Sequence, residues 1–132
     1  EKGAGETMQE DVQFHNVDGN CGGIKLAEIS KRPSGKVKER DFKADIITID
    51  SLELEECDLI KIDVEGYELK VLQGAVGTLL RNHGVMIVME QSGEEVKWDW
   101  GEQNEATHFL TTMGYECTGQ RIHDYVFESP NY

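Results

Sequence analysis

Acidic side chains lie within and just after an apolar segment in the middle of the chain. Residues 59–64 read Leu-Ile-Lys-Ile-Asp-Val, so Lys61 and Asp63 are ionisable residues inside an otherwise aliphatic run. A charge in such a run is costly to bury, which favours a functional role for Asp63. A carboxylate here could take a proton from a substrate hydroxyl or bind a cation. The alternative is that Asp63, Glu65 and Glu68 only cap the helix that follows.

A second carboxylate ends the next apolar segment. Val85-Met86-Ile87-Val88-Met89 is fully apolar, and Glu90 follows it directly. Open α/β sheets place ligand-binding residues at the carboxyl ends of their strands, so we expect Glu90 to line the same crevice as Asp63. An ordinary loop position is the alternative for Glu90.

Cysteines and histidines show no spacing typical of a metal site. The three cysteines and four histidines are widely scattered, and no Cys-x-x-Cys arrangement is present. We therefore predict no metal, and we interpret His15, His108 and His123 first as surface or structural histidines. The separated, odd-numbered cysteines favour a reducing compartment, and we expect a cytoplasmic protein.

The central elements that would position these carboxylates form a strand, helix, strand unit. Residues 59–64 and 85–89 suit strands that are covered on both faces, and the leucine and valine spacing over 68–81 predicts one amphipathic helix ending near Gly84. Such a unit is a right-handed crossover between parallel neighbours. The sequence therefore indicates an α/β fold.

The remaining elements extend this unit in both directions. Residues 12–15, 24–29 and 45–49 suit strands, the basic stretch up to Lys43 reads as a loop, and residues 106–113 suit a helix closed by Gly114. Residues 115–118 and 125–128 are typical of a terminal antiparallel hairpin.

Length and charge restrict the class of protein. The chain has 132 residues and a formal net charge of −13, and we interpret it as a single domain with a strand and loop region over 1–43 and an α/β core over 44–132. The acidic residues concentrate in the core region, which makes nucleic acid an improbable partner. No apolar run approaches membrane-spanning length, so no membrane partner is expected.

The central motif resembles a known family. Residues 58–75, Asp-Leu-Ile-Lys-Ile-Asp-Val-Glu-Gly-Tyr-Glu-Leu-Lys-Val-Leu-Gln-Gly-Ala, are similar to the signature of FkbM-type methyltransferases. Residues 47–52, Ile-Thr-Ile-Asp-Ser-Leu, resemble the stretch that precedes that signature, and the likeness covers about residues 10–128. The resemblance implies a seven-stranded Rossmann-like sheet and methyl transfer from S-adenosylmethionine to a hydroxyl, often on a sugar or polyketide.

The resemblance also implies site residues. Asp63 and Glu65 become the candidate catalytic residues. The candidate substrate-binding residues are Glu68, Glu90, Asn20 and His15, the last two near a turn over residues 16–23 that corresponds to a family segment approaching the active site. Trp98 and Trp100 suit a sugar-stacking platform or a core edge, and we leave them out of the site.

One part of the family pattern is missing. Gly3-Ala4-Gly5 follows no apolar strand, and no Gly-rich cofactor turn or ribose-binding acid is present. We therefore expect a partial Rossmann-like methyltransferase sheet, mostly parallel with a C-terminal antiparallel hairpin, that lacks the N-terminal cofactor-binding strands. Such a chain is expected to bind the cofactor weakly and to be inactive by itself. The alternative is a truncated, non-catalytic module that self-associates through an exposed sheet edge or pairs with a partner chain.

Overall fold

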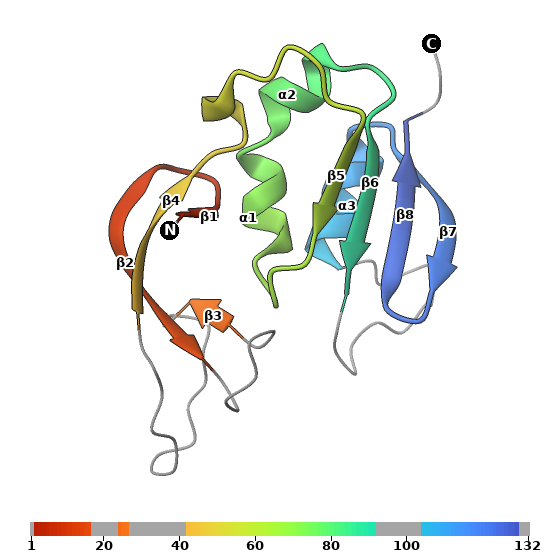
Figure 1. The fold of residues 1–132 in the computed structure, drawn as a ribbon. Helices are drawn as coiled ribbons and strands as arrows, with labels where there is room; N and C mark the ends of the chain where they lie inside the picture. The colour runs from red at the N-terminus through yellow and green to blue at the C-terminus, as the bar shows by residue number, and fades with distance from the viewer. Residues whose placement is uncertain (1, 17–23, 27–41, 92–103, 130–132) are drawn as a thin grey trace.

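A computed structural model describes residues 2–16, 24–26, 42–91 and 104–129. Outside the described residues lie positions 17–23 of the expected turn, with Asn20, most of the basic stretch, and Trp98 and Trp100. In chain order the elements are β1 Lys2–Ala4, β2 Gln9–Asn16, β3 Ile24–Leu26, β4 Phe42–Ile47, η1 Asp50–Leu52, β5 Leu59–Ile62, α1 Glu68–Gln73, α2 Val76–Arg81, β6 Met86–Glu90, α3 Glu105–Thr112, β7 Glu116–Arg121 and β8 Asp124–Glu128 (Figure 1).

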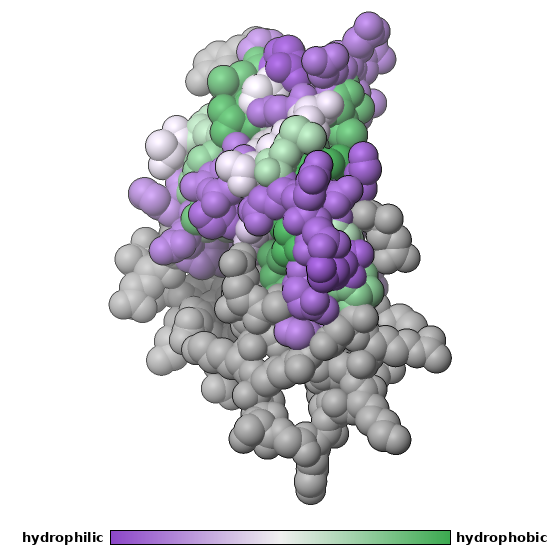
Figure 2. Space-filling view, turned by 90° about the vertical axis from the view of Figure 1, so that its left-hand side faces the viewer, coloured by the Kyte–Doolittle hydropathy of each residue, from purple (hydrophilic) through white to green (hydrophobic). Residues whose placement is uncertain are grey.

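The first four strands form one sheet, called sheet A, in the order β1-β4-β2-β3. β1 pairs with β4 in parallel, whereas β2 runs antiparallel to both β3 and β4. The sequence pattern predicts β2 and β4 but not β1, because Lys-Gly-Ala has neither apolar alternation nor β-branched residues. Hydrophilic side chains predominate on the described part of the side seen in Figure 2, which is the side of the molecule where sheet A lies.

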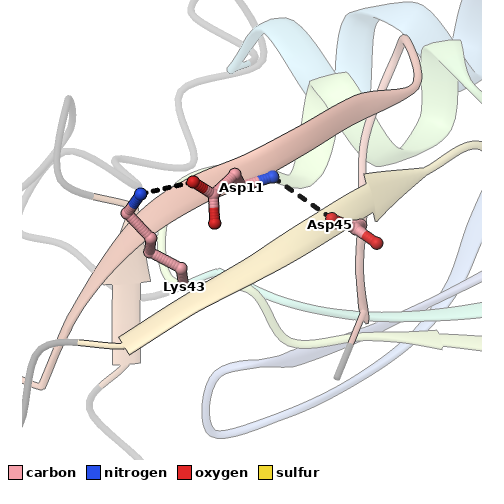
Figure 3. Close-up of polar contacts among 3 residues, drawn as sticks. All are labelled: Asp11, Lys43 and Asp45. Atoms are coloured by element: carbon pink, nitrogen blue, oxygen red, sulfur yellow. Dashed lines mark hydrogen bonds and ion pairs between the residues drawn. The ribbon is translucent and has the colours of Figure 1, made fainter.

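A bulge in β2 is stabilised by two acidic residues on the exposed side of sheet A. The register between β2 and β4 shifts between Gln9 and Val12, and Asp11 has φ of 59°. The Asp11 N–H donates to Asp45 Oδ1 over 3.1 Å, and the Lys43 ammonium forms an ion pair with the Asp11 carboxylate (Figure 3). The arrangement satisfies the backbone donor that the bulge removes from the ladder.

The last four strands form the second sheet, called sheet B, in the order β5-β6-β8-β7. β5 and β6 are parallel neighbours joined through α1 and α2, which confirms the predicted crossover unit. The predicted terminal hairpin is also confirmed, since β7 and β8 pair antiparallel and β8 runs antiparallel to β6.

The expected α/β fold class is correct, but the expectation of a mostly parallel sheet is wrong. Among the described strands there are two mixed four-stranded sheets, and only the β1–β4 and β5–β6 pairs are parallel. Parallel pairing requires a crossover connection, which α1 with α2 supplies for β5 and β6. The two-residue turn of Ile122 and His123 between β7 and β8 gives an antiparallel pair instead.

The helix predicted over residues 68–81 is two helices, broken at Gly74 and Ala75. In a continuous helix the Thr78 N–H would bond the Gly74 carbonyl. Here the Thr78 N–H donates to Asp50 Oδ1 over 2.6 Å, and the Gly74 carbonyl accepts from the Asp50 N–H over 2.9 Å. Asp50 therefore inserts into the helical ladder and starts α2 afresh.

One apolar core joins the two sheets. Ile46 of β4 is 1% exposed, and Leu72 of α1 and Phe127 of β8 are fully buried in the same cluster. The core face of sheet B, covered by α3 in Figure 1, carries Ile62, Ile87, Met89, Tyr125 and Phe127. The opposite face of sheet B, called the open face, presents the alternate residues, among them the exposed Leu59, Lys61 and Met86.

Candidate functional site

The turn after β5 has an unusual backbone. Glu65 has φ of 54° and Gly66 has φ of 102°, so two consecutive residues lie in the left-handed region. Such a conformation suits glycine but costs free energy at Glu65, and costs of this kind concentrate at functional sites. The turn lets the chain leave β5 sharply and enter α1, which leaves Asp63 at the exposed carboxyl end of the strand.

Glu68 supports this turn. Its Oε1 accepts a hydrogen bond from the Gly66 N–H over 2.9 Å, which is the reach-back of a first-turn glutamate to a free backbone donor. The geometry gives Glu68 a local structural contact, and its substrate-binding role stays a prediction. Glu65 is half-buried beside it, and its catalytic role also stays a prediction.

Asp63 and Glu90 meet at the carboxyl ends of two parallel neighbours, at the lower end of β5 and β6 in Figure 1. The pKa of Glu90 is raised, chiefly by the negative charge of Asp63, then by burial, by a hydrogen bond with the Asp63 side chain and by the charge of Asp124. A negative charge beside Glu90 disfavours the ionised form of its carboxyl group, which is the physical cause of this raised pKa. The structure thus brings together two residues that the sequence placed at one edge.

Asp124 is a third acid at this place, and the sequence reasoning missed it. β8 begins at Asp124, and the register pairs Asp124 with Glu90. The Lys61 ammonium lies 3.2 Å from Asp124 Oδ1, and this hydrogen bond raises the pKa of Lys61. The sequence places Asp124 just before the second strand of the predicted hairpin. Its position beside Glu90, however, follows only once β8 is known to pair with β6.

The other predicted residues lie elsewhere or outside the described chain. His15 is a half-buried residue of β2 in sheet A, with Lys25 as its register partner in β3. Asn20 lies outside the described residues. The described part of the chain therefore does not test the prediction that His15 and Asn20 contact substrate.

A shallow depression of about 440 Å³ occurs near α2, lined by Asp50, Glu53, Leu54, Glu55 and Arg81. It adjoins the last turn of α2, at the opposite end of the molecule from the carboxyl ends of β5 and β6 (Figure 1). Within the described ranges, no three His, Cys, Asp or Glu side chains are grouped so as to hold a metal ion. None of the described helices is long and apolar enough to cross a membrane.

Comparison with known proteins decides the family. The model of the methyltransferase FkbM domain matches residues 8–117, which contain β2 to β6, α3 and the carboxylate pair. The chain belongs to the FkbM methyltransferase family. No curated protein and no solved structure gives a significant match. FkbM proteins are Rossmann-like methyltransferases that use S-adenosylmethionine.

The described residues fit one end of that cofactor. Asp63 and Glu90 offer negative charge to a sulfonium group at the edge where α/β sheets bind ligands. For the adenosine end, the Gly-rich turn of the common pattern has no counterpart among the described strands, because Gly3 lies within the short β1 and Gly5 packs against Ile46 and Tyr67.

Proposed function

We propose that this FkbM chain carries the acceptor side of an S-adenosylmethionine-dependent O-methyltransferase. The substrate class is a hydroxyl of a sugar, polyketide or similar small molecule. One observation carries the proposal, the placement of the Asp63 and Glu90 carboxyl groups side by side at the carboxyl ends of parallel strands within the family match. Methylation of a hydroxyl needs a base at the reacting oxygen, and a carboxylate at this edge can serve as that base.

The catalytic roles fall to Asp63 and Glu65. When bound, S-adenosylmethionine supplies an electrophilic methyl group. Asp63, exposed just after β5, would accept the proton of the acceptor hydroxyl when that oxygen takes the methyl group, the carbon–sulfur bond breaks and S-adenosylhomocysteine leaves. Glu65, held in the left-handed turn, orients the same hydroxyl.

The substrate-binding roles fall to Glu68, Glu90, Asn20 and His15. Carboxylate, amide and imidazole groups suit a hydroxyl-rich acceptor such as a carbohydrate, because they accept and donate hydrogen bonds to several hydroxyls at once. Glu90 has direct structural support, through its contact with Asp63.

The test replaces the proposed base. Asp63→Asn in the native protein should lower kcat for methylation of hydroxyl acceptors by about 100-fold or more, since an amide cannot take the proton. Label transferred from S-adenosylmethionine and mass spectrometry of the product identify the methyl ether. Asp11→Asn, in the surface ion pair of sheet A, is the control. Transfer to nitrogen or carbon, or full activity of Asp63→Asn, would contradict the proposal.

Cofactor affinity is a separate measurement. We propose that the chain by itself binds S-adenosylhomocysteine weakly, with Kd of about 1 mM, since its sequence shows neither the Gly-rich cofactor turn nor the ribose-binding acid of the common pattern. Calorimetric titration checks this. Micromolar binding that Asp63→Asn abolishes would show instead that a complete cofactor site is retained.

A second candidate is a non-catalytic module that self-associates through a sheet edge. Its support is β5, whose outer edge pairs with no described strand. Sedimentation equilibrium would then show a dimer that Leu59→Lys dissociates. The matched control is Leu80→Lys, because Leu59 is 56% exposed on β5 and Leu80 is 63% exposed on α2. A monomer at all concentrations would remove this candidate.

A further inference from the structure

Four charged side chains from three strands gather on the open face of sheet B. Lys61 is exposed on β5, and Asp63 follows it two residues later. Glu90 ends β6, and Asp124 is its register partner at the start of β8. Because alternate residues share a face, these four project to the same side of the sheet.

Lys61 reaches across a strand to make its contact. Its register partner on β6 is Val88, whereas its ammonium lies 3.2 Å from Asp124, which belongs to the strand beyond β6. The aliphatic stem must therefore cross β6 between Val88 and Glu90. This route leaves the positive charge beside the Asp63–Glu90 pair.

The Lys61–Asp124 contact contributes little to stability. The two side chains are 53% and 44% exposed, and exposed ion pairs of this kind add little to the free energy of unfolding. The contact matters because it fixes the position of the Lys61 ammonium. An ammonium fixed next to the Asp63 and Glu90 side chains favours the ionised form of a carboxyl group.

We propose that Lys61 and Asp124 are positioning residues for the Asp63–Glu90 pair, with Asp124 tethering the Lys61 ammonium so that one carboxylate of the pair stays ionised. This inference rests on the proposed function, because the ionised carboxylate is the one that accepts the hydroxyl proton. Through Asp124, the terminal hairpin of β7 and β8 thereby contributes a residue to the site.

Neighbouring charges determine how Glu90 titrates. Asp63 and Lys61 act on it from β5 and the turn after β5, and Asp124 acts on it from β8. Arg121 of β7 is the register partner of Asp124. The acids raise the pKa of Glu90, with Asp63 first, and Lys61 lowers it. Removing the ammonium should therefore raise the pKa of Glu90 further.

The experiment follows the Glu90 side-chain carboxyl by carbon-detected NMR through a pH titration of the chain without cofactor. Lys61→Met keeps the aliphatic stem and removes the charge, so the Glu90 midpoint should rise, and Lys61→Arg should restore it. In an Asp124→Asn background the rise caused by Lys61→Met should be smaller, because the ammonium is no longer tethered. Lys61→Gln repeats the measurement if the methionine variant folds poorly.

Lys43→Met is the matched control, because Lys43 forms a similarly exposed ion pair with Asp11 in sheet A. It should leave the Glu90 midpoint unchanged. A Glu90 midpoint that Lys61→Met does not move would overturn the proposal, as would a rise of equal size with and without Asp124. Since the readout needs no catalysis, full activity of Asp63→Asn would overturn the proposed function and leave this result standing.

Discussion

At the scale of single residues, the Asp50 carboxylate bonds the backbone N–H groups at the start of α2, which a preceding helical turn would otherwise bond. It accepts hydrogen bonds from the Gly77 N–H, the Thr78 N–H and the Thr78 hydroxyl, at 2.9, 2.6 and 2.8 Å. Burial raises the pKa of Asp50, but these hydrogen bonds and the charge of Arg81 outweigh it, so the net shift is downward. Asp50, in the stretch that resembles the family pattern, therefore holds the start of α2.

Replacement of Asp50 by asparagine should show this role through its pH dependence. The variant keeps an acceptor oxygen but loses the charge, so the free energy of unfolding at neutral pH should fall by about 1–3 kcal/mol. A lowered pKa contributes stability above the unfolded value, near 3.8, and that contribution is lost as the pH falls through the folded value. The gap between native and variant should therefore close in acid.

Urea unfolding followed by circular dichroism, at neutral pH and near pH 3, measures this gap. Asp58→Asn, an exposed aspartate before β5, should change little at either pH. A gap of the same size in acid would mean that the carboxylate charge does not contribute to the start of α2.

At the scale of elements, the junction of α1 and α2 fits against sheet A with no room for a side chain. A Cβ built on Gly74 would lie 2.0 Å from the Gly5 carbonyl oxygen, and the Gly5 N–H in turn donates to Ile47 over 2.9 Å. Gly74→Ala should therefore push β1 away and lower the free energy of unfolding by about 1–3 kcal/mol.

Denaturant unfolding measures the cost of Gly74→Ala, and amide chemical shifts of Gly5 and Asp50 locate it. Gly119→Ala is the matched control, because a Cβ there would meet Val126 at an ordinary 3.6 Å. Equal stability of the two variants would show that the junction moves freely and that the close approach is not required.

Periodicity predicted the elements whose partners are close in sequence. The apolar runs gave β5 and β6, and the crossover between them follows from their spacing. The break at Gly74 escaped prediction because Asp50, the residue that causes it, is 28 positions from Thr78. Asp124 escaped for the same reason, since only the β6–β8 register brings it to Glu90. Local sequence patterns therefore could not predict the features that depend on contacts between residues far apart in the sequence.

At the scale of the whole molecule, the shared core makes the two sheets one cooperative unit. Ile46 from sheet A packs in the same buried cluster as Ile87 and Phe127 from sheet B, with Leu72 of α1 in the same cluster. Ile46→Ala should therefore lower the free energy of unfolding by about 2–5 kcal/mol through the lost contacts and the cavity left behind. In a single cooperative unit, this loss of stability also lowers the protection of residues that make no contact with Ile46.

Native-state hydrogen exchange tests this cooperativity residue by residue. In Ile46→Ala, the most protected amides of β4 and of β6 should lose the same free energy, because both exchange through global unfolding. Leu80→Ala, at a position 63% exposed on α2, should leave both sheets nearly unchanged. If only the β4 amides lost protection, sheet A would open independently, and the acidic edge of sheet B would keep its geometry without sheet A.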